Sequence, residues 1–348
     1  MDFVDWSISI RNPSIYLAIC ITIPSMALYI AEIVTIVRHK QFHNSFYALF
    51  VMRAIPDWLG VLNSFYAQRL PSIIGAVLYP IYLKFPNWML AMDLFLAAHT
   101  FQANNLATIL ILLNRLTAII MPIKHEKMWR KFLPLLTMFV FCVPILTCWP
   151  AFKENGIIQL NNPNSTTDRS FSFMTAEGDA PYLNYIIYID AIFSIIFTII
   201  CVLLNIFTFV AYKLHVKKVS INGNNNGVEI EKKLLVYALA TFLGHALVTS
   251  LLLIQIISNM NPKTITMLIV YYPLITDIGT VVISSWLLLW ASGTFRQQLI
   301  KNFVIIRFTD RANIRVVKIE GPQNNNDRAF GGAVGHQLQN RIAVPYNN

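Results

Sequence analysis

The chain has 348 residues, of which 56% are hydrophobic and only 13% are charged. The charged fraction is far below the about 25% that is typical of soluble domains, so the composition excludes a soluble globular protein and indicates a membrane protein. A net charge of +10 raises the question of a nucleic-acid partner, but the Lys and Arg residues gather in loops on one side of the predicted spans, where they face anionic lipid.

Seven segments are long and apolar enough to cross a bilayer as helices. They cover about residues 14–37, 46–67, 89–121, 132–151, 182–211, 234–257 and 265–291. We therefore predict an all-α membrane protein, a bundle of seven transmembrane helices. The stretch 71–83 is also apolar, but it is too short for a span, so we predict a folded or interfacial loop there.

The distribution of basic residues predicts that the N-terminus lies outside the cell. In that orientation the outer segments hold six of the 27 Lys and Arg residues and the inner segments hold twenty. The expected organisation is an extracellular N-terminus at 1–13, the bundle at 14–291, a short amphipathic helix 8 at 292–303 and a disordered cytoplasmic tail at 304–348.

Other local signals agree with a membrane protein that carries no disulfide-stabilised extracellular domain. The first residues lack the basic region of a cleaved signal peptide. All four cysteines lie within or beside apolar runs, and no Cys or His spacing indicates a metal site. Asn164 begins an Asn-Ser-Thr sequence in the predicted loop after the fourth span, so we predict that it is glycosylated.

The third span, residues 88–122, is too polar for a lipid-facing anchor. Along its middle lie Asp93, His99, Gln102, Asn104 and Asn105, and near its end stand Asn114 and Arg115. A polar group in hydrocarbon costs a few kcal/mol unless it is partnered. We therefore expect this helix to lie at the centre of the bundle, surrounded by the other helices.

Polar and aromatic groups from four predicted spans converge at one depth in the outer half of the bundle. At ~1.5 Å per residue, His99 lies about 24 Å from Arg115, in the outer third of the bilayer. The candidate ligand-binding residues are His99, Phe101, Gln102, Asn105, Tyr185, Tyr188, His245 and Tyr272. The alternative is that these groups satisfy one another as helix-to-helix hydrogen bonds, each worth roughly 0.6–2 kcal/mol.

A second polar cluster is predicted at mid-membrane. Arg53 and Asp57 are four residues apart and so share one helical face, where they can pair. Asp57 lies about 16 Å from the start of its span, and Asn104 lies about as deep from the same side. If the two helices are antiparallel neighbours, these three residues form one cluster.

Three motifs in order resemble the rhodopsin-like G-protein-coupled receptors. Residues 114–123, Asn-Arg-Leu-Thr-Ala-Ile-Ile-Met-Pro-Ile, resemble the end of helix 3 in those receptors, Asp-Arg-Tyr-x-Ala-Ile-x-x-Pro-Leu. Residues 54–59 resemble their helix-2 motif Leu-Ala-x-Ala-Asp-Leu-Leu, and residues 295–299 resemble their eighth helix. The usual cysteine pair, the Asn-Pro-x-x-Tyr of helix 7 and the Trp-x-Pro of helix 6 are absent from the sequence.

Further details are similar to the nematode serpentine chemoreceptors. These are the Asn-Arg pair itself, the Asn-Ser-Phe-Tyr at 44–47 and the Met-Pro-Ile-Lys-His-Glu-Lys-Met-Trp at 121–129. Class gamma is the most similar class and class V is the near alternative. The resemblance covers about residues 14–303.

This resemblance implies a chemosensory receptor that binds a small molecule and signals to a heterotrimeric G protein. It implies a multi-pass protein of the plasma membrane, in the cilium of a sensory neuron. The implied switch comprises Asn114, Arg115, Ile119 and Pro122, with Glu231 as a candidate locking partner. The alternative for Arg115 is a simple anchor to lipid phosphates. In these receptors the helix-2 aspartate also helps to bind sodium, which makes Asp57 a candidate sodium ligand; an ion-free pair with Arg53 is the alternative.

Enzymes and ion channels or transporters are the two other functional classes open to a seven-span protein. Only two of the seven histidines lie within spans, and no Ser/His/Asp set or nucleophile elbow appears, so we predict neither an enzyme nor a cofactor. A seven-span ion channel or transporter is the alternative function. Its signature would be Gly- or Pro-broken helices or rings of charge, which the sequence does not show.

Overall fold

A computed structural model of the chain describes residues 3–160, 169–175, 181–221, 226–257 and 271–302. Within them, seven helical segments are long and apolar enough to cross a membrane. These segments are Pro13–Arg38, Ser45–Tyr82, Asn87–Ile120, Pro122–Lys153, Tyr185–Lys217, Lys232–Leu251 and Tyr271–Ala291. The predicted all-α, seven-helix membrane fold is confirmed, and the protein is a multi-pass membrane protein. The predicted orientation and the four-part organisation stay predictions.

The first two spans are joined by a tight, capped connection. Helix α1 (Phe3–Arg38) is followed by the 3₁₀ turn η1 (Lys40–Phe42), and α2 (Ser45–Ser64) then begins. Asn44 caps α2, because its Oδ1 accepts a hydrogen bond from the backbone N–H of Tyr47 at 3.2 Å. The Asn-Ser-Phe-Tyr sequence therefore has a local structural role as the start of a helix.

The predicted loop at 71–83 is wrong, because the chain stays helical. Helix α2 continues through the π-helical turn η2 (Phe65–Arg69) into α3 (Leu70–Tyr82), which bends at Ile74. Pro71 lies two residues after the π-helical turn, and because it has no N–H it leaves one hydrogen bond of this continuous helix unmade. Tyr82 packs edge-to-face on Phe171 at 5.3 Å between ring centroids, which holds the end of α3 in place.

Helix α4 (Asn87–Ile120) is the hub that its polar residues predicted. It contacts α2, α5 (Pro122–Cys148), α6 (Pro181–Ile221) and α7 (Asn226–Ile257). Pro122 follows the end of α4 and occupies the first turn of α5, as its fixed φ and missing N–H favour.

The connection after α5 contains structure that the sequence did not predict. A 3₁₀ segment, η3 (Trp149–Lys153), leads into β1 (Gly156–Leu160), which pairs antiparallel with β2 (Phe171–Thr175). Gly156 is opposite Thr175, and Leu160 is opposite Phe171. The predicted glycosylation site, Asn164, lies outside the described residues.

The last span is not a regular α-helix. Residues 271–277 are α-helical, η4 (Ile278–Val282) is a π-helical turn, and α9 (Ile283–Ala291) completes the span. After Ser292, residues 293–302 are helical again, where helix 8 was predicted; the predicted tail at 304–348 lies outside the described residues.

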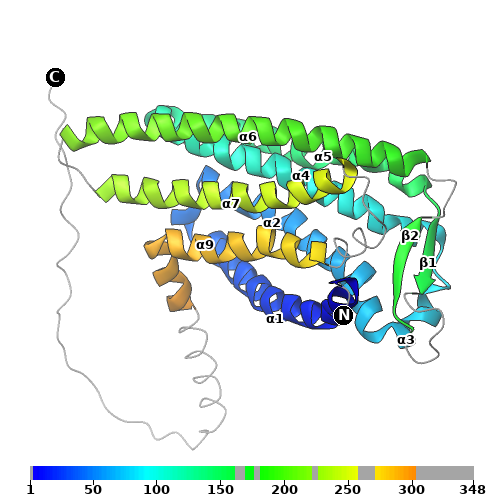
Figure 1. The fold of residues 1–348 in the computed structure, drawn as a ribbon. Helices are drawn as coiled ribbons and strands as arrows, with labels where there is room; N and C mark the ends of the chain where they lie inside the picture. The colour runs from blue at the N-terminus through cyan, green and yellow to red at the C-terminus, as the bar shows by residue number, and fades with distance from the viewer. Residues whose placement is uncertain (1–2, 161–168, 176–180, 222–225, 258–270, 303–348) are drawn as a thin grey trace, which may run out of the picture. The chain divides into compact units, whose positions relative to one another are not determined.

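The two ends of the bundle carry different structures (Figure 1). The β1–β2 hairpin and α3 lie at one end, which we call the strand end. The helix at 293–302 lies at the other, where α4 ends and α5 begins; we call this the Arg115 end. Between them, aromatic side chains of several helices form much of the apolar core, including Tyr29, Phe46, Phe50, Trp129 and Tyr237.

Candidate functional site

A cavity of about 240 Å³ lies inside the bundle and reaches toward the strand end. It is bounded by α2, by η2, by α4, by α7 and by residues 272–280; we call it the central cavity. The α4 side is lined by Asp93, Leu94, Ala97, Thr100, Phe101 and Asn104. These positions recur every three or four residues, so one continuous face of α4 forms the wall.

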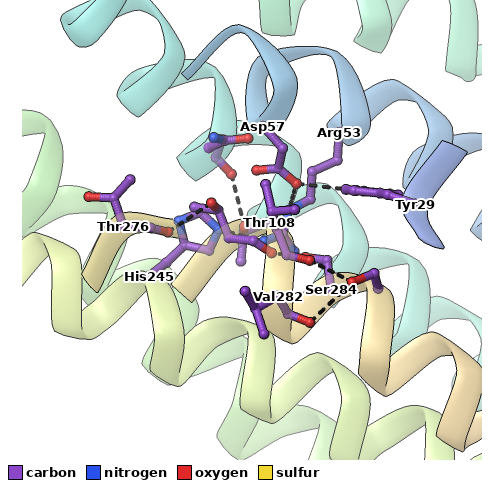
Figure 2. Close-up of polar contacts among 12 residues, drawn as sticks. Tyr29, Arg53, Asp57, Thr108, His245, Thr276, Val282 and Ser284 are labelled. Atoms are coloured by element: carbon purple, nitrogen blue, oxygen red, sulfur yellow. Dashed lines mark hydrogen bonds and ion pairs between the residues drawn. The ribbon is translucent and has the colours of Figure 1, made fainter. Parts of the chain in front are cut away.

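A buried ion pair lies at the deep side of the central cavity (Figure 2). Arg53 Nε is 3.5 Å from Asp57 Oδ2, and both side chains are fully buried. The Tyr29 hydroxyl donates to the same carboxylate oxygen at 3.1 Å. These contacts distribute the carboxylate charge over two partners on α1 and α2, as a charge buried away from water requires.

His245 on α7 completes this arrangement, and its contact identifies its protonation state. Arg53 Nη2 lies 2.7 Å from His245 Nε2. A guanidinium has no acceptor, so Nε2 accepts the hydrogen bond and the ring is neutral, with its proton on Nδ1. Arg53 therefore joins α2 to α7 across the bundle with a single positive charge.

Asn104 stands on the opposite wall, on α4. Its side chain hydrogen-bonds the Asp57 carboxylate, and its backbone carbonyl accepts from Thr108 Oγ1 at 2.8 Å. The structure thus brings Arg53, Asp57 and Asn104 together, because α2 and α4 are neighbours in the bundle. Whether sodium binds at Asp57 stays a prediction; the ion pair with Arg53 is present without it.

A second buried ion pair, which the sequence reasoning missed, joins the second and seventh spans. Arg69 Nη2 pairs with Asp277 Oδ2, and Thr22 Oγ1 on α1 donates to the same oxygen at 2.5 Å. Arg69 belongs to the π-helical turn η2, and Asp277 directly precedes the π-helical turn η4. Asp277 had a recognisable signal, since an acidic residue inside an apolar span rarely lacks a partner or a function.

Three of the eight residues predicted to bind ligand line the central cavity: Phe101, His245 and Tyr272. Gln102 instead bridges three helices. Its Nε2 donates to Asp190 Oδ1 on α6 at 2.7 Å, and its Oε1 accepts from Thr147 Oγ1 on α5 at 2.6 Å. This residue follows the helix-to-helix alternative, because it lies on the face of α4 that packs against α5 and α6.

The other four candidates lie away from the cavity. His99 is buried and stacks on Phe95 at 5.6 Å between ring centroids. Asn105 is fully buried and does not line the central cavity. Tyr185 and Tyr188 on α6 are 46% and 64% exposed, so they face the outside of the bundle. Depth along a helix was predicted for these residues, but depth alone does not specify which way a side chain points.

A smaller cavity of about 100 Å³ adjoins the central cavity at the strand end. The two share Gln68, Asp93 and Pro273 as lining residues. Phe171 and Phe173 of β2 line the smaller cavity. The hairpin therefore contributes to the wall between the central cavity and the strand end.

A separate polar cluster lies at the Arg115 end. Arg115 is buried and its guanidinium carbon lies 3.9 Å from the centroid of the Phe46 ring, a cation–π contact. Asn114 Nδ2 donates to Ser45 Oγ at 3.0 Å. Ser45 in turn donates through its Oγ to Glu126 Oε2 at 2.9 Å, so α4, α2 and α5 are connected by a chain of hydrogen bonds.

This cluster borders a hollow of about 410 Å³ that is lined by Arg115, Glu126, Leu234 and Thr294, among others. Ile119 is buried one turn beyond Arg115. The candidate lock Glu231 lies outside the residues whose side chains are described. Glu126 was not predicted, although its spacing of four residues from Arg130 is typical of a helical ion pair, which the structure contains at 3.1 Å.

Comparison with known proteins gives concordant matches. The model of a family described as Srg family chemoreceptor matches residues 15–299. Serpentine receptor class gamma-5 of Caenorhabditis elegans is 26% identical over 120 residues, which are 32% of this chain and 36% of that protein. Class gamma-9 of the same organism is 25% identical over 159 residues, 44% of this chain and 47% of that protein.

A third relative, serpentine receptor class gamma-16 of Caenorhabditis elegans, is 26% identical over 194 residues, 51% of this chain and 55% of that protein. The matched part of the chain thus spans about a third to a half of the length of these curated relatives.

Proposed function

Because this chain belongs to the Srg family of chemoreceptors, a family of receptors and not of enzymes, we propose that it binds a small chemical cue in the central cavity and signals to a heterotrimeric G protein at the Arg115 end. The proposal places the protein in the plasma membrane of a sensory neuron, in the cilium, with the strand end outside the cell. The C. elegans class gamma receptors are its distant relatives.

The observation that carries the proposal is the central cavity itself. Ligand sites in helix bundles lie between helices and combine apolar walls with a few placed polar groups. Here Phe101 and Val248 supply apolar surface, while His245, Tyr272 and Asn104 supply polar groups from α4, α7 and the last span. A ligand bound among these groups contacts α4, α7 and the last span, and the same helices extend to the Arg115 end.

A continuous set of side chains supports coupling between the two ends. At the deep side of the cavity, His245 holds Arg53, which also pairs with Asp57. Tyr237 lies two turns along α7 from His245 and packs edge-to-face on Phe46 at 5.6 Å between ring centroids. Phe46 in turn carries Arg115 on its ring. A ligand that moves α7 at His245 therefore also disturbs the surface on which Arg115 rests.

The proposal is tested by a signalling assay in cells that display the receptor together with a promiscuous Gα subunit. A chemical library identifies an agonist, and its potency is then measured for Phe101→Ala and Tyr272→Ala. Each variant is expected to raise the half-maximal concentration about tenfold or more, since each truncates a cavity wall. Tyr188→Ala is the matched control, because that tyrosine faces away from the cavity.

Two results would contradict the proposal. Equal potency in all four proteins at equal surface expression would remove the central cavity as the ligand site. Agonist-evoked current that persists in cells without heterotrimeric G proteins would favour the ion-channel alternative.

A further inference from the structure

The central cavity contains buried oxygen atoms that have no partner within the described protein. They are the side-chain carbonyl oxygens of Asn63, Gln68 and Asn104. Asn63 is 7% exposed and Asn104 is 6% exposed, so neither amide is free to reach bulk water. A carbonyl oxygen only accepts hydrogen bonds. A buried acceptor without a donor is destabilising, so these atoms require donors inside the cavity.

The neighbours of Asn63 and Asn104 determine which atom of each amide points where. Asn63 Nδ2 donates to Asp93 Oδ1 at 2.8 Å and to the Asp93 backbone carbonyl at 3.2 Å. If the amide were flipped, its oxygen would face two acceptors. The hydrogen bond between Asn104 and the Asp57 carboxylate excludes the flipped amide there for the same reason.

The charges around the cavity are unequal. Three carboxylates line it: Asp57, Asp93 and Asp277. Asp57 is paired with Arg53, and Asp277 is paired with Arg69. Asp93 has an amide partner, Asn63, and no salt bridge to any described residue. With His245 neutral, the three carboxylates of the described lining are paired with only two cations, Arg53 and Arg69.

We propose that the central cavity binds a small organic cation with an ammonium group, which sits beside Asp93 and donates its N–H bonds to the Asp93 carboxylate and to the amide oxygens of Asn63 and Gln68. Asn104 is eleven residues from Asp93 on α4, about 16 Å along the cavity at ~1.5 Å per residue, and so lies beyond the reach of this ammonium group. An ammonium group supplies three donors and no acceptor, which matches the unpartnered atoms in kind. The inference rests on the proposed function, since it specifies the ligand class of the same site.

The volume of the cavity restricts the size of this ligand. About 240 Å³ is below the about 300–1,000 Å³ of sites for drug-sized ligands. The ligand is therefore a compact amine with a short chain or a single ring, and water is the occupant that competes with it.

The experiment measures direct binding to the purified full-length chain in lipid nanodiscs, with thermal unfolding as the readout. The probes are matched sets in which one skeleton carries an amine, an alcohol or a carboxylate: the n-butyl set and the 2-phenylethyl set. The amine of at least one set is expected to raise the unfolding temperature, and its alcohol and carboxylate are not. If no amine does so, or if the carboxylate does so equally, the proposal is overturned.

Two nearly isosteric variants then identify the carboxylate. Asp93→Asn is expected to weaken amine binding about tenfold or more, because it removes the charge and retains the shape. Asp190→Asn is the matched control: Asp190 is also a buried carboxylate with a single amide partner, Gln102 at 2.7 Å, but it does not line the cavity. Equal loss in both variants, or no loss in Asp93→Asn, would contradict the assignment.

A third variant keeps the test informative if Asp93→Asn does not fold. Asn63→Ser removes one proposed acceptor at the cavity wall and is expected to weaken amine binding, whereas retained binding would contradict the proposal. The two proposals fail differently. If an uncharged agonist signals and its potency depends on Phe101, the proposed receptor function stands and the proposed ammonium ligand is contradicted. If an amine binds but evokes no G-protein signal, the proposed ammonium ligand stands and the proposed receptor function is contradicted.

Discussion

Breaking the buried Arg69–Asp277 pair should destabilise the protein far more than removing the pair altogether. Asp277→Asn leaves the Arg69 guanidinium buried without a counter-ion, and Arg69→Met leaves the Asp277 carboxylate in the same position. Both side chains are at most 3% exposed, so water cannot replace the lost partner. Each single change is expected to cost about 3–5 kcal/mol, roughly two to four powers of ten in the folded-to-unfolded ratio.

The double variant removes both charges at once and should recover most of this loss. A buried ion pair replaced by neutral side chains of similar size is often near neutral, so we expect the double variant within about 2 kcal/mol of the original. The coupling energy between the two positions should then be at least ~2 kcal/mol. Thr22 retains a hydrogen-bond acceptor when Asp277 becomes Asn, which limits any further loss.

Thermal unfolding can be followed through the thiols of the protein itself. Cys148 and Cys201 are buried, whereas Cys20 and Cys142 are exposed. With the exposed pair replaced by Ala, a thiol-reactive fluorophore reports only unfolding. The control is Arg130→Ala, which breaks an ion pair whose Arg side chain is 70% exposed and should cost at most about 0.5 kcal/mol. The reasoning would be refuted if either single variant lost as little stability as this control. It would also be refuted if the loss in the double variant equalled the sum of the losses in the two single variants.

Four further outcomes are expected. Gly244→Ala should destabilise the fold by about 1–3 kcal/mol in the same unfolding assay, because its new Cβ would lie 2.6 Å from the backbone oxygen of Gly279. Gln102→Ala should lower thermal stability and surface delivery by removing a bridge among three helices, and a changed agonist potency at normal stability would contradict this. Arg115→Ala should reduce agonist-evoked G-protein signalling at unchanged surface expression. An unaltered response would contradict the proposed role of Arg115 as a switch. Asn164→Gln should abolish the mobility shift that glycosidase produces, whereas a shift that persists would place the glycan elsewhere.

Several features of this protein follow from the sequence alone because they depend on local properties. The spans are recognisable because their length and hydropathy match the bilayer, and all seven are helical in the structure. The central place of α4 follows from its polar residues, since each needs a partner away from lipid. Arg53 and Asp57 pair because a spacing of four residues places both on one face of a helix.

Which faces meet was decided only by the tertiary structure. Phe101 and Gln102 are adjacent in sequence, yet Phe101 lines the central cavity while Gln102 bridges α5 and α6. Tyr185 and Tyr188 stand at the predicted depth but face outward. A count along a helix gives the height of a side chain, whereas its direction depends on how that helix is rotated against its neighbours.

The helix from α2 to α3 and the second ion pair also depend on contacts distant in sequence. The predicted second span ended at residue 67, which left Arg69 outside the bilayer, next to the predicted loop at 71–83. The partner of Arg69, Asp277, is 208 residues away and stands on the last span. Only when the first, second and seventh spans pack together does the carboxylate reach the guanidinium, and its charge then allows the arginine to stay buried and the chain to remain helical.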